Sequence, residues 1–319
     1  MTTTGQPHLL ERKLLFVTGK GGVGKTTVAS SLALLAATEG KRTLVCEVDA
    51  KGNLADFYGT APLRFTPTEV QNRLFAMTMD TEESLREYLK LQLRVPLISR
   101  LGPLAKTFDF VATAAPGVKE ILTIGKLAYE VRERNYDLVV VDASATGHVV
   151  GQLASPVAMK ELVSVGIVRQ QTDWMLKILT DPLQTGVVVV ATPEEMPVNE
   201  TIELIGRLDS ETDVNVAAVI ANRVLPELFS RDEEAAFELL DAPAGRSALA
   251  ALTGPESALV VDAARLAVDL RRSRAVHLKN LAERLPPTIP LINVPYLFTR
   301  SHGIRTTRQV ADRLGEELL

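Results

Sequence analysis

The first residues suited to chemistry form a glycine-rich run that also carries two lysines and two threonines. The run reads Gly19-Lys20-Gly21-Gly22-Val23-Gly24-Lys25-Thr26-Thr27 and lies between a short apolar stretch and a segment with helical spacing. Glycines let backbone N–H groups curl around one anion, and the start of the following helix adds the positive end of its dipole. The pattern matches a nucleotide phosphate loop. Its expected binding residues are Gly19, Gly21, Gly22, Val23, Gly24, Lys25, Thr26 and Thr27.

Two oxygen-bearing side chains predict a Mg²⁺ site beside this loop. The hydroxyl of Thr26 stands at the position that binds Mg²⁺ in phosphate loops, one residue after the lysine that reaches the β- and γ-phosphates. Asp142 closes the apolar run 136–141, and a carboxylate at such a strand end commonly helps to hold the ion. The sequence therefore predicts ATP and Mg²⁺ as cofactors, with Thr26 and Asp142 at the metal.

Asp49 is the candidate for positioning the attacking water. It follows the β-rich run 42–48, and a carboxylate at this strand end faces the same crevice as the phosphate loop. Loose phosphoryl transfer depends more on positioning than on a strong base, so an ordinary carboxylate suffices. The alternative is that Asp49 caps the next helix, and Glu47 is a weaker candidate for the catalytic role.

The elements expected around these residues alternate between strand and helix. Short apolar runs predict buried strands of a parallel sheet, because helices cover both faces of such a sheet. This order predicts an α/β fold with a doubly wound, mostly parallel sheet and a single domain over 1–319. Helical patterns at about 81–135 and 151–181 predict an inserted helical subdomain. Strands are expected at 14–18, 42–48, 74–79, 136–141, 187–191, 214–221 and 289–294, and helices at 25–39, 81–93, 156–179, 255–285 and 301–319.

Composition narrows the classes of function. The chain has 319 residues and a net charge of -4, so it lacks the overall basic character of a nucleic-acid-binding protein. Its single cysteine, Cys46, cannot form an internal disulfide or a thiolate metal cage. No apolar stretch approaches the roughly 20 residues that span a bilayer. We expect a cytoplasmic protein that neither inserts stably into membranes nor binds nucleic acid.

Three segments together resemble the ATPases of the arsenite pump and of the guided entry of tail-anchored proteins. The phosphate loop resembles the deviant Walker A class, in which the lysine after the first glycine reaches the partner's γ-phosphate across a dimer. Asp142-Ala143-Ser144-Ala145-Thr146-Gly147-His148 resembles the family's sensor loop D-T-A-P-T-G-H, with Ala145 in place of the proline. The first switch, from Asp49 to Leu54, also lacks the family's proline. The resemblance is closest to bacterial members labelled anion-transporting ATPases.

The resemblance implies a dimeric ATPase in which Lys20 acts in trans and Asp49 serves catalysis. The dimer would be a homodimer or a pair with a paralogue, and it would couple ATP to a protein client or partner. Asn222 and Pro295 would contact the adenine, although Asn222 could instead be a simple turn residue. The zinc-binding C-x-x-C pair and the metalloid-binding cysteines of the two named groups are not found in this chain.

Two other functions stay open at this point. Partitioning or positioning ATPases of the plasmid-segregation or septum-site class share the same phosphate loop, but the Thr146-Gly147-His148 ending and the lack of basic charge disfavour them. A non-hydrolysing, nucleotide-dependent regulator is the third hypothesis, because both switch segments are altered. Apolar residues within 156–179 could line a client groove, but packing in a helical core is the favoured interpretation.

Overall fold

An eight-stranded sheet forms the centre of the computed structural model, which describes residues 8–49, 52–93, 117–162, 167–299 and 303–319. The strand order is β3-β4-β2-β5-β1-β6-β7-β8, and every neighbouring pair is parallel except the antiparallel pair β3 and β4. The strands are β1 (Leu14–Gly19), β2 (Thr43–Glu47), β3 (Thr68–Gln71), β4 (Leu74–Thr78), β5 (Leu138–Asp142), β6 (Thr185–Ala191), β7 (Val216–Val224) and β8 (Leu291–Pro295).

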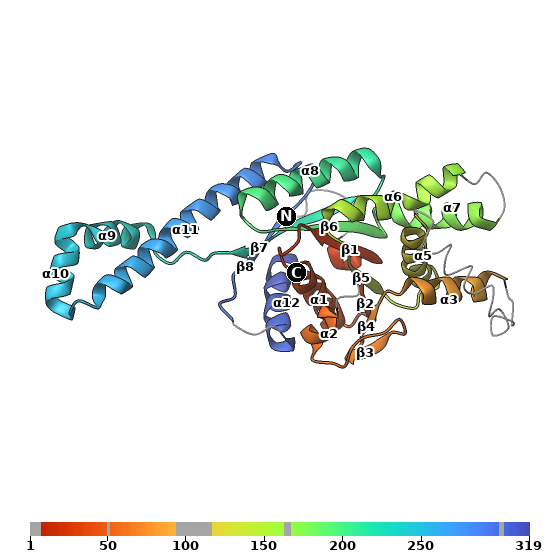
Figure 1. The fold of residues 1–319 in the computed structure, drawn as a ribbon, viewed down its shortest axis with the longest axis horizontal. Helices are drawn as coiled ribbons and strands as arrows, with labels where there is room; N and C mark the ends of the chain where they lie inside the picture. Colours follow the sequence, from red (N-terminus) through yellow and green to blue (C-terminus); the bar gives the residue numbers. More distant parts are fainter. Residues whose placement is uncertain (1–7, 50–51, 94–116, 163–166, 300–302) are drawn as a thin grey trace.

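Helices cover both faces of this sheet (Figure 1). Leu14 and Phe16 of β1 pack into one apolar cluster, whereas Leu15 and Val17 pack into the other, as the alternation of side chains along a strand requires. The doubly wound, mostly parallel fold is therefore confirmed. One layer holds α1 (Lys25–Thr38), α2 (Asn53–Tyr58) and α12 (Ile304–Leu318), and the other holds α5 (Val118–Arg132), α6 (Thr146–Leu162), α7 (Ile167–Leu179), α8 (Glu195–Glu211) and part of α11 (Ser257–Arg284).

A group of helices gathers at one end of the molecule, on the right of Figure 1. It consists of α5, α6, α7 and α3 (Thr81–Leu93). Lys126 of α5 is buried, and its ammonium lies 2.8 Å from Glu87 of α3 and 2.7 Å from Glu130. These helices fall within the predicted insertions, except that α6 begins at Thr146, before the second one. Residues 94–116 and 163–166 of the insertions lie outside the described residues. Their standing as a separate subdomain stays a prediction.

Helix α6 begins ten residues earlier than the sequence predicted, at Thr146 instead of Pro156. A proline inside a helix lacks the N–H that would bond to the carbonyl four residues before it. Here the hydroxyl of Ser155 donates to that carbonyl, on Gln152, over 2.8 Å. The helix therefore continues through Pro156. The sensor segment shortens to a loop over 143–145, and its last three residues form the first turn of α6.

The remaining helices, together with α11, make an extension that the sequence predicted only in part. Helix α11 was expected, but α8, α9 (Arg231–Asp241), α10 (Pro243–Thr253) and β3 were not. Helices α9 and α10 pack on the outer half of α11, and the three project from the body at the left of Figure 1.

No helix of the described ranges is both long and apolar enough to cross a membrane.

Candidate functional site

The phosphate loop joins the end of β1 to the start of α1, and backbone geometry requires glycine at its positions 19 and 24. Gly19 has a φ of +146°, and a Cβ placed there would lie 2.2 Å from the carbonyl oxygen of Val190 on β6. Gly24 has a φ of +95° and precedes the first residue of α1. Because Gly24 has no side chain, it can adopt this conformation at the start of α1. The free N–H groups of the first helical turn then face the loop. The predicted loop residues thus form one cradle at the helix start.

Asn222 holds this loop from the neighbouring side of the sheet. Its side-chain nitrogen donates to the carbonyl oxygen of Val23 over 2.8 Å, and its oxygen accepts the N–H of Arg223 over 2.9 Å. Asn222 is buried, and a Cβ on Gly24 would come 2.3 Å from its nitrogen. Pro295 pairs with Val224 at the end of the next strand. The two residues predicted to contact adenine therefore lie on adjacent strands, and that role stays a prediction.

The hydroxyl of Thr26 donates to Oδ2 of Asp142 over 2.7 Å. This contact joins the phosphate loop to the end of β5, where Glu47 of β2 lies in register with Asp142. Burial raises the pKa of Asp142 to about 6, and the negative charges of Glu47 and Asp49 act in the same direction. The Thr26 hydrogen bond and the charge of Lys25 oppose this rise. The carboxylate is thus a buried anion with a deficit of positive charge around it.

These groups fit a bound Mg²⁺. Hydroxyl and carboxylate oxygens are ligands that Mg²⁺ prefers, and in nucleotide sites the ion takes its other ligands from phosphates and water. Within the described ranges, no three His, Cys, Asp or Glu side chains gather as a set that could hold a metal. Thr26 and Asp142 would hold the ion together with a nucleotide, and this role stays a prediction.

A second set of hydrogen bonds joins Asp49 to the sensor loop. The hydroxyl of Ser144 donates to Oδ1 of Asp49 over 3.0 Å. The carbonyl of Ser144 accepts the hydroxyl proton of Thr18 over 2.9 Å, which ties the loop to the end of β1. Asp49 is exposed to solvent, so water can reach its carboxylate. Ser144 and Thr18 had not been assigned individual roles, and only their neighbours in the motifs pointed to them.

The two lysines of the phosphate loop lie in different surroundings. The ammonium of Lys25 lies 3.4 Å from the carbonyl oxygen of Lys20, along the loop itself. The ammonium of Lys20 leaves the loop and lies 2.6 Å from Glu200 and 2.7 Å from the sulfur of Met196, both on α8. Glu200 was missed by the sequence analysis because it belongs to no local motif and lies about 180 residues along the chain.

Comparison with known proteins agrees with this geometry. The profile of the anion-transporting ATPase family matches residues 12–175 and 167–238, which is more than half of the chain. "ATPase BagA" of Mycobacterium tuberculosis is 31% identical over 237 residues, which cover 70% of this chain and 69% of that protein. The chain belongs to the anion-transporting ATPase family. It is therefore an ATPase, as the sequence predicted.

Two further relatives are named after the arsenical pump and get3. "Putative arsenical pump-driving ATPase 2" of Aquifex aeolicus is 28% identical over 251 residues, covering 67% of this chain and 81% of that protein. "ATPase get3" of Schizosaccharomyces japonicus is 32% identical over 163 residues, or 49% of each chain. The predicted resemblance to the arsenite-pump and tail-anchor ATPases is thereby confirmed.

Proposed function

We propose that this anion-transporting ATPase family member is a Mg²⁺-dependent cytoplasmic enzyme that hydrolyses ATP as a dimer and couples nucleotide state to a protein client or partner. The observation that carries the proposal is the opposite placement of the two loop lysines. Lys25 lies along its own loop, where it would contact phosphates bound there. Lys20 lies outside the loop against α8, and this outward position supports a role toward a phosphate held by another subunit.

Each residue has a part in this proposal. Backbone N–H groups of the loop and Lys25 would bind the phosphates, and Asp49 would orient the attacking water. Mg²⁺, held by Thr26 and Asp142, would neutralise charge on the phosphates. Lys20 of the partner subunit would add a positive charge. Its attraction to the phosphates would be stronger in the transition state than in the ground state. A cation delivered in this way is worth roughly 10³ to 10⁵ in rate.

The contacts of the sensor loop support coupling between hydrolysis and the helices. Ser144 bonds to Asp49, and two residues later the chain enters α6. Helix α6 packs on α5 and α7. Between α3, α5, α6 and α7 lies an apolar cavity of about 300 Å³. A change at Asp49 on hydrolysis would therefore reach the helical end of the molecule through α6.

The comparisons disfavour the two alternative functions that the sequence left open. The family match disfavours a partitioning or positioning ATPase, and it favours hydrolysis over a purely regulatory nucleotide sensor. The favoured packing interpretation of residues 156–179 is supported for Met175, Ile178 and Leu179, which are buried in the main core. A client groove made of these three side chains is therefore not part of the proposal.

The test is steady-state ATP hydrolysis over a series of protein concentrations, with Lys20→Ala and Asp49→Asn measured alongside. Specific activity should rise with protein concentration and fall at least about 100-fold in both variants, because each removes a group needed in the transition state. Omission of Mg²⁺ should abolish turnover. Activity that is independent of concentration and unaffected by Lys20→Ala would overturn the dimeric mechanism.

A further inference from the structure

Helices α9, α10 and α11 form an arm with its own small core. Phe237 of α9 packs against Val261 and Val268 on one face of α11. The ring of Phe229 stacks on Phe237 with centroids 5.3 Å apart. This core is separate from the two clusters that cover the sheet. The arm is therefore held by contacts of its own.

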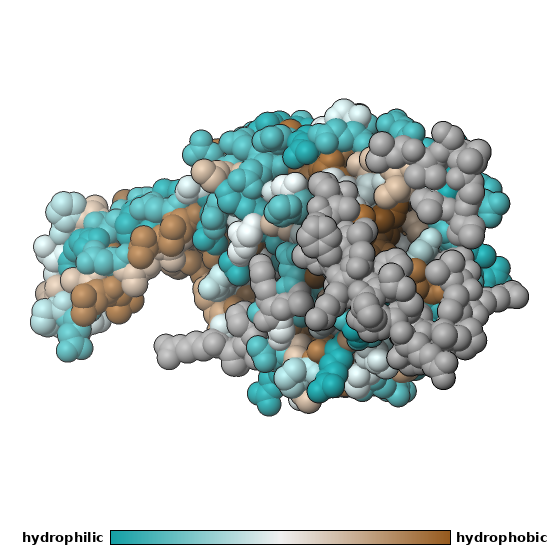
Figure 2. Space-filling model, turned by 45° about the vertical axis from the view of Figure 1, so that its right-hand side comes forward, coloured by the Kyte–Doolittle hydropathy of each residue, from teal (hydrophilic) through white to brown (hydrophobic). Residues whose placement is uncertain are grey.

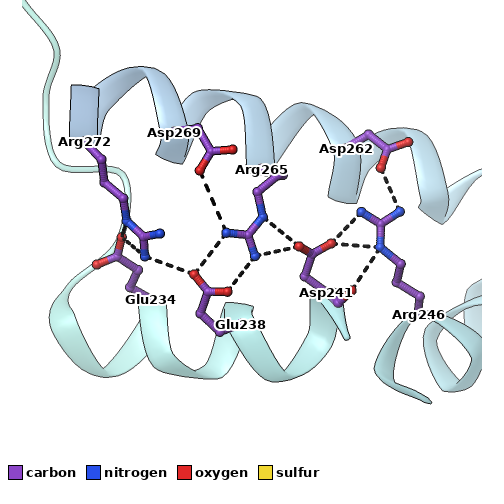
Figure 3. Close-up of polar contacts among 8 residues, drawn as sticks. All are labelled: Glu234, Glu238, Asp241, Arg246, Asp262, Arg265, Asp269 and Arg272. Carbon is purple, nitrogen blue, oxygen red and sulfur yellow. Dashed lines mark hydrogen bonds and ion pairs between the residues drawn. The ribbon is translucent and has the colours of Figure 1, made fainter. Parts of the chain in front are cut away.

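An arginine–carboxylate network fixes the arm along the same face (Figure 3). Arg265 of α11 lies 2.7 Å from Glu238 and 2.5 Å from Asp241, both on α9. Arg246 of α10 contacts two carboxylates: it lies 2.5 Å from Asp241 and 2.7 Å from Asp262 of α11. Single exposed ion pairs contribute little, but a network of forked contacts restricts geometry. The network thus holds α9 and α10 on one face of α11 and leaves the opposite face uncovered by them.

That opposite face of α11 is apolar and exposed. Leu259, Ala263, Leu266 and Leu270 follow one another at intervals of four, three and four residues, which places them in one stripe along the helix. The exposed fractions of the three leucines are 73%, 61% and 46%. Figure 2 shows hydrophobic residues along the arm, which lies at the left of the picture. A row of exposed apolar side chains of this kind is a candidate contact surface for another molecule.

The stripe leads toward the candidate site. The same spacing continues from Leu270 to Arg274 and to Leu281, which is fully buried against the body. Arg274 bonds to Glu194, at the start of α8, over 3.3 Å. Two residues further, Met196 is 64% exposed and contacts the ammonium of Lys20. The exposed stripe is thus an outward extension of the surface that surrounds Lys20.

We infer that a second copy of this chain covers the stripe formed by Leu259, Ala263, Leu266 and Leu270. The inference rests on the proposed dimer: a subunit whose γ-phosphate receives Lys20 must lie against Met196, and therefore beside the arm that begins at the same place. Asp262 and Asp269 border the stripe on one side and are paired with Arg246 and Arg265, so this border carries little net charge that would attract an anionic membrane. The arm then holds the partner subunit while Lys20 reaches its nucleotide.

Sedimentation velocity in Mg²⁺ and ATPγS over a concentration series tests this inference. The variant Leu259→Ser/Leu266→Ser should raise the Kd of dimerisation by about 100-fold, because both subunits lose two buried leucines. The matched control Leu239→Ser/Leu240→Ser changes two exposed leucines of α9, on the other side of α11, and should leave the Kd within about twofold. Binding of a fluorescent ADP by each monomer should be unchanged.

The outcomes separate the inference from the proposed function. A wild-type protein that stays monomeric at all concentrations overturns both the dimer and the inference. A wild-type protein that dimerises, with a serine variant of unchanged Kd, overturns the inference alone. If the serine variant does not fold, Leu266→Ala shortens the stripe without adding a polar group. It should raise the Kd about fivefold to tenfold, and an unchanged Kd would count against the stripe.

Discussion

The ammonium nitrogen of Lys20 lies 2.6 Å from Oε1 of Glu200 on α8 of the same chain. The lysine proposed to act on a partner's nucleotide is thus held by its own subunit in this structure. Both side chains are about one-third exposed, and an ion pair of this kind is worth no more than about 1 kcal/mol. Such a contact restrains Lys20 but can be broken by an approaching γ-phosphate.

Glu200→Gln is expected to raise ATP turnover at low protein concentration by about twofold to fivefold, because Lys20 no longer has to leave a carboxylate. The measurement is turnover against protein concentration, with half-maximal activity at a lower concentration than in the wild type. Glu203→Gln is the matched control, since Glu203 is an exposed carboxylate on the same helix. Reduced turnover in Glu200→Gln would mean that Glu200 orients Lys20 for catalysis.

Asp142→Asn should stabilise the protein without nucleotide or Mg²⁺ at neutral pH. Burial raises the folded-state pKa of Asp142 from 3.8 to about 6, so the wild type loses stability as pH rises through this interval. The free energy of unfolding of the variant should exceed that of the wild type by about 2–3 kcal/mol above pH 7 and by little near pH 4. Urea titrations in EDTA at several pH values measure this. A difference that does not change with pH would contradict the account.

Asn222→Ala should loosen the phosphate loop. The hydrogen bond to the Val23 carbonyl is buried, and its loss leaves an unpaired acceptor that costs about 1–3 kcal/mol. We expect binding of ATP and of inorganic pyrophosphate to weaken together, by about tenfold. Calorimetry with both ligands makes the test, and Asn199→Ala, at an exposed position of α8, is the control. Weaker binding of ATP alone would assign Asn222 to the adenine instead of the loop.

The sequence predicted most of the sheet and the phosphate loop because both have local signals. Apolar runs such as 187–191 are long enough to identify buried parallel strands, and the loop's glycines and lysines stand at fixed spacing. The start of α6 was missed because Pro156 usually breaks a helix. The compensating bond from Ser155 to Gln152 is a feature of side-chain geometry, which no pattern in the sequence specified.

The arm and Glu200 could not be predicted for a different reason. The acidic and basic residues of α9 resemble those of any solvated helix, and their pairing with Arg265 and Arg272 depends on how α9 folds back on α11. Glu200 meets Lys20 only because α8 lies beside the loop in the folded chain. Contacts between segments so far apart in sequence arise from the tertiary fold, which local propensity does not determine.

Mixing two inactive variants tests the central claim most directly. Lys20→Ala keeps Asp49, and Asp49→Asn keeps Lys20, so a mixed dimer contains one site with its own Asp49 and the partner's Lys20. An equimolar mixture should recover about a quarter of wild-type ATP turnover, because half of the dimers are mixed and each has one complete site. This recovery would establish action in trans across a dimer of this chain. A mixture that shows only the sum of the two residual activities would contradict it.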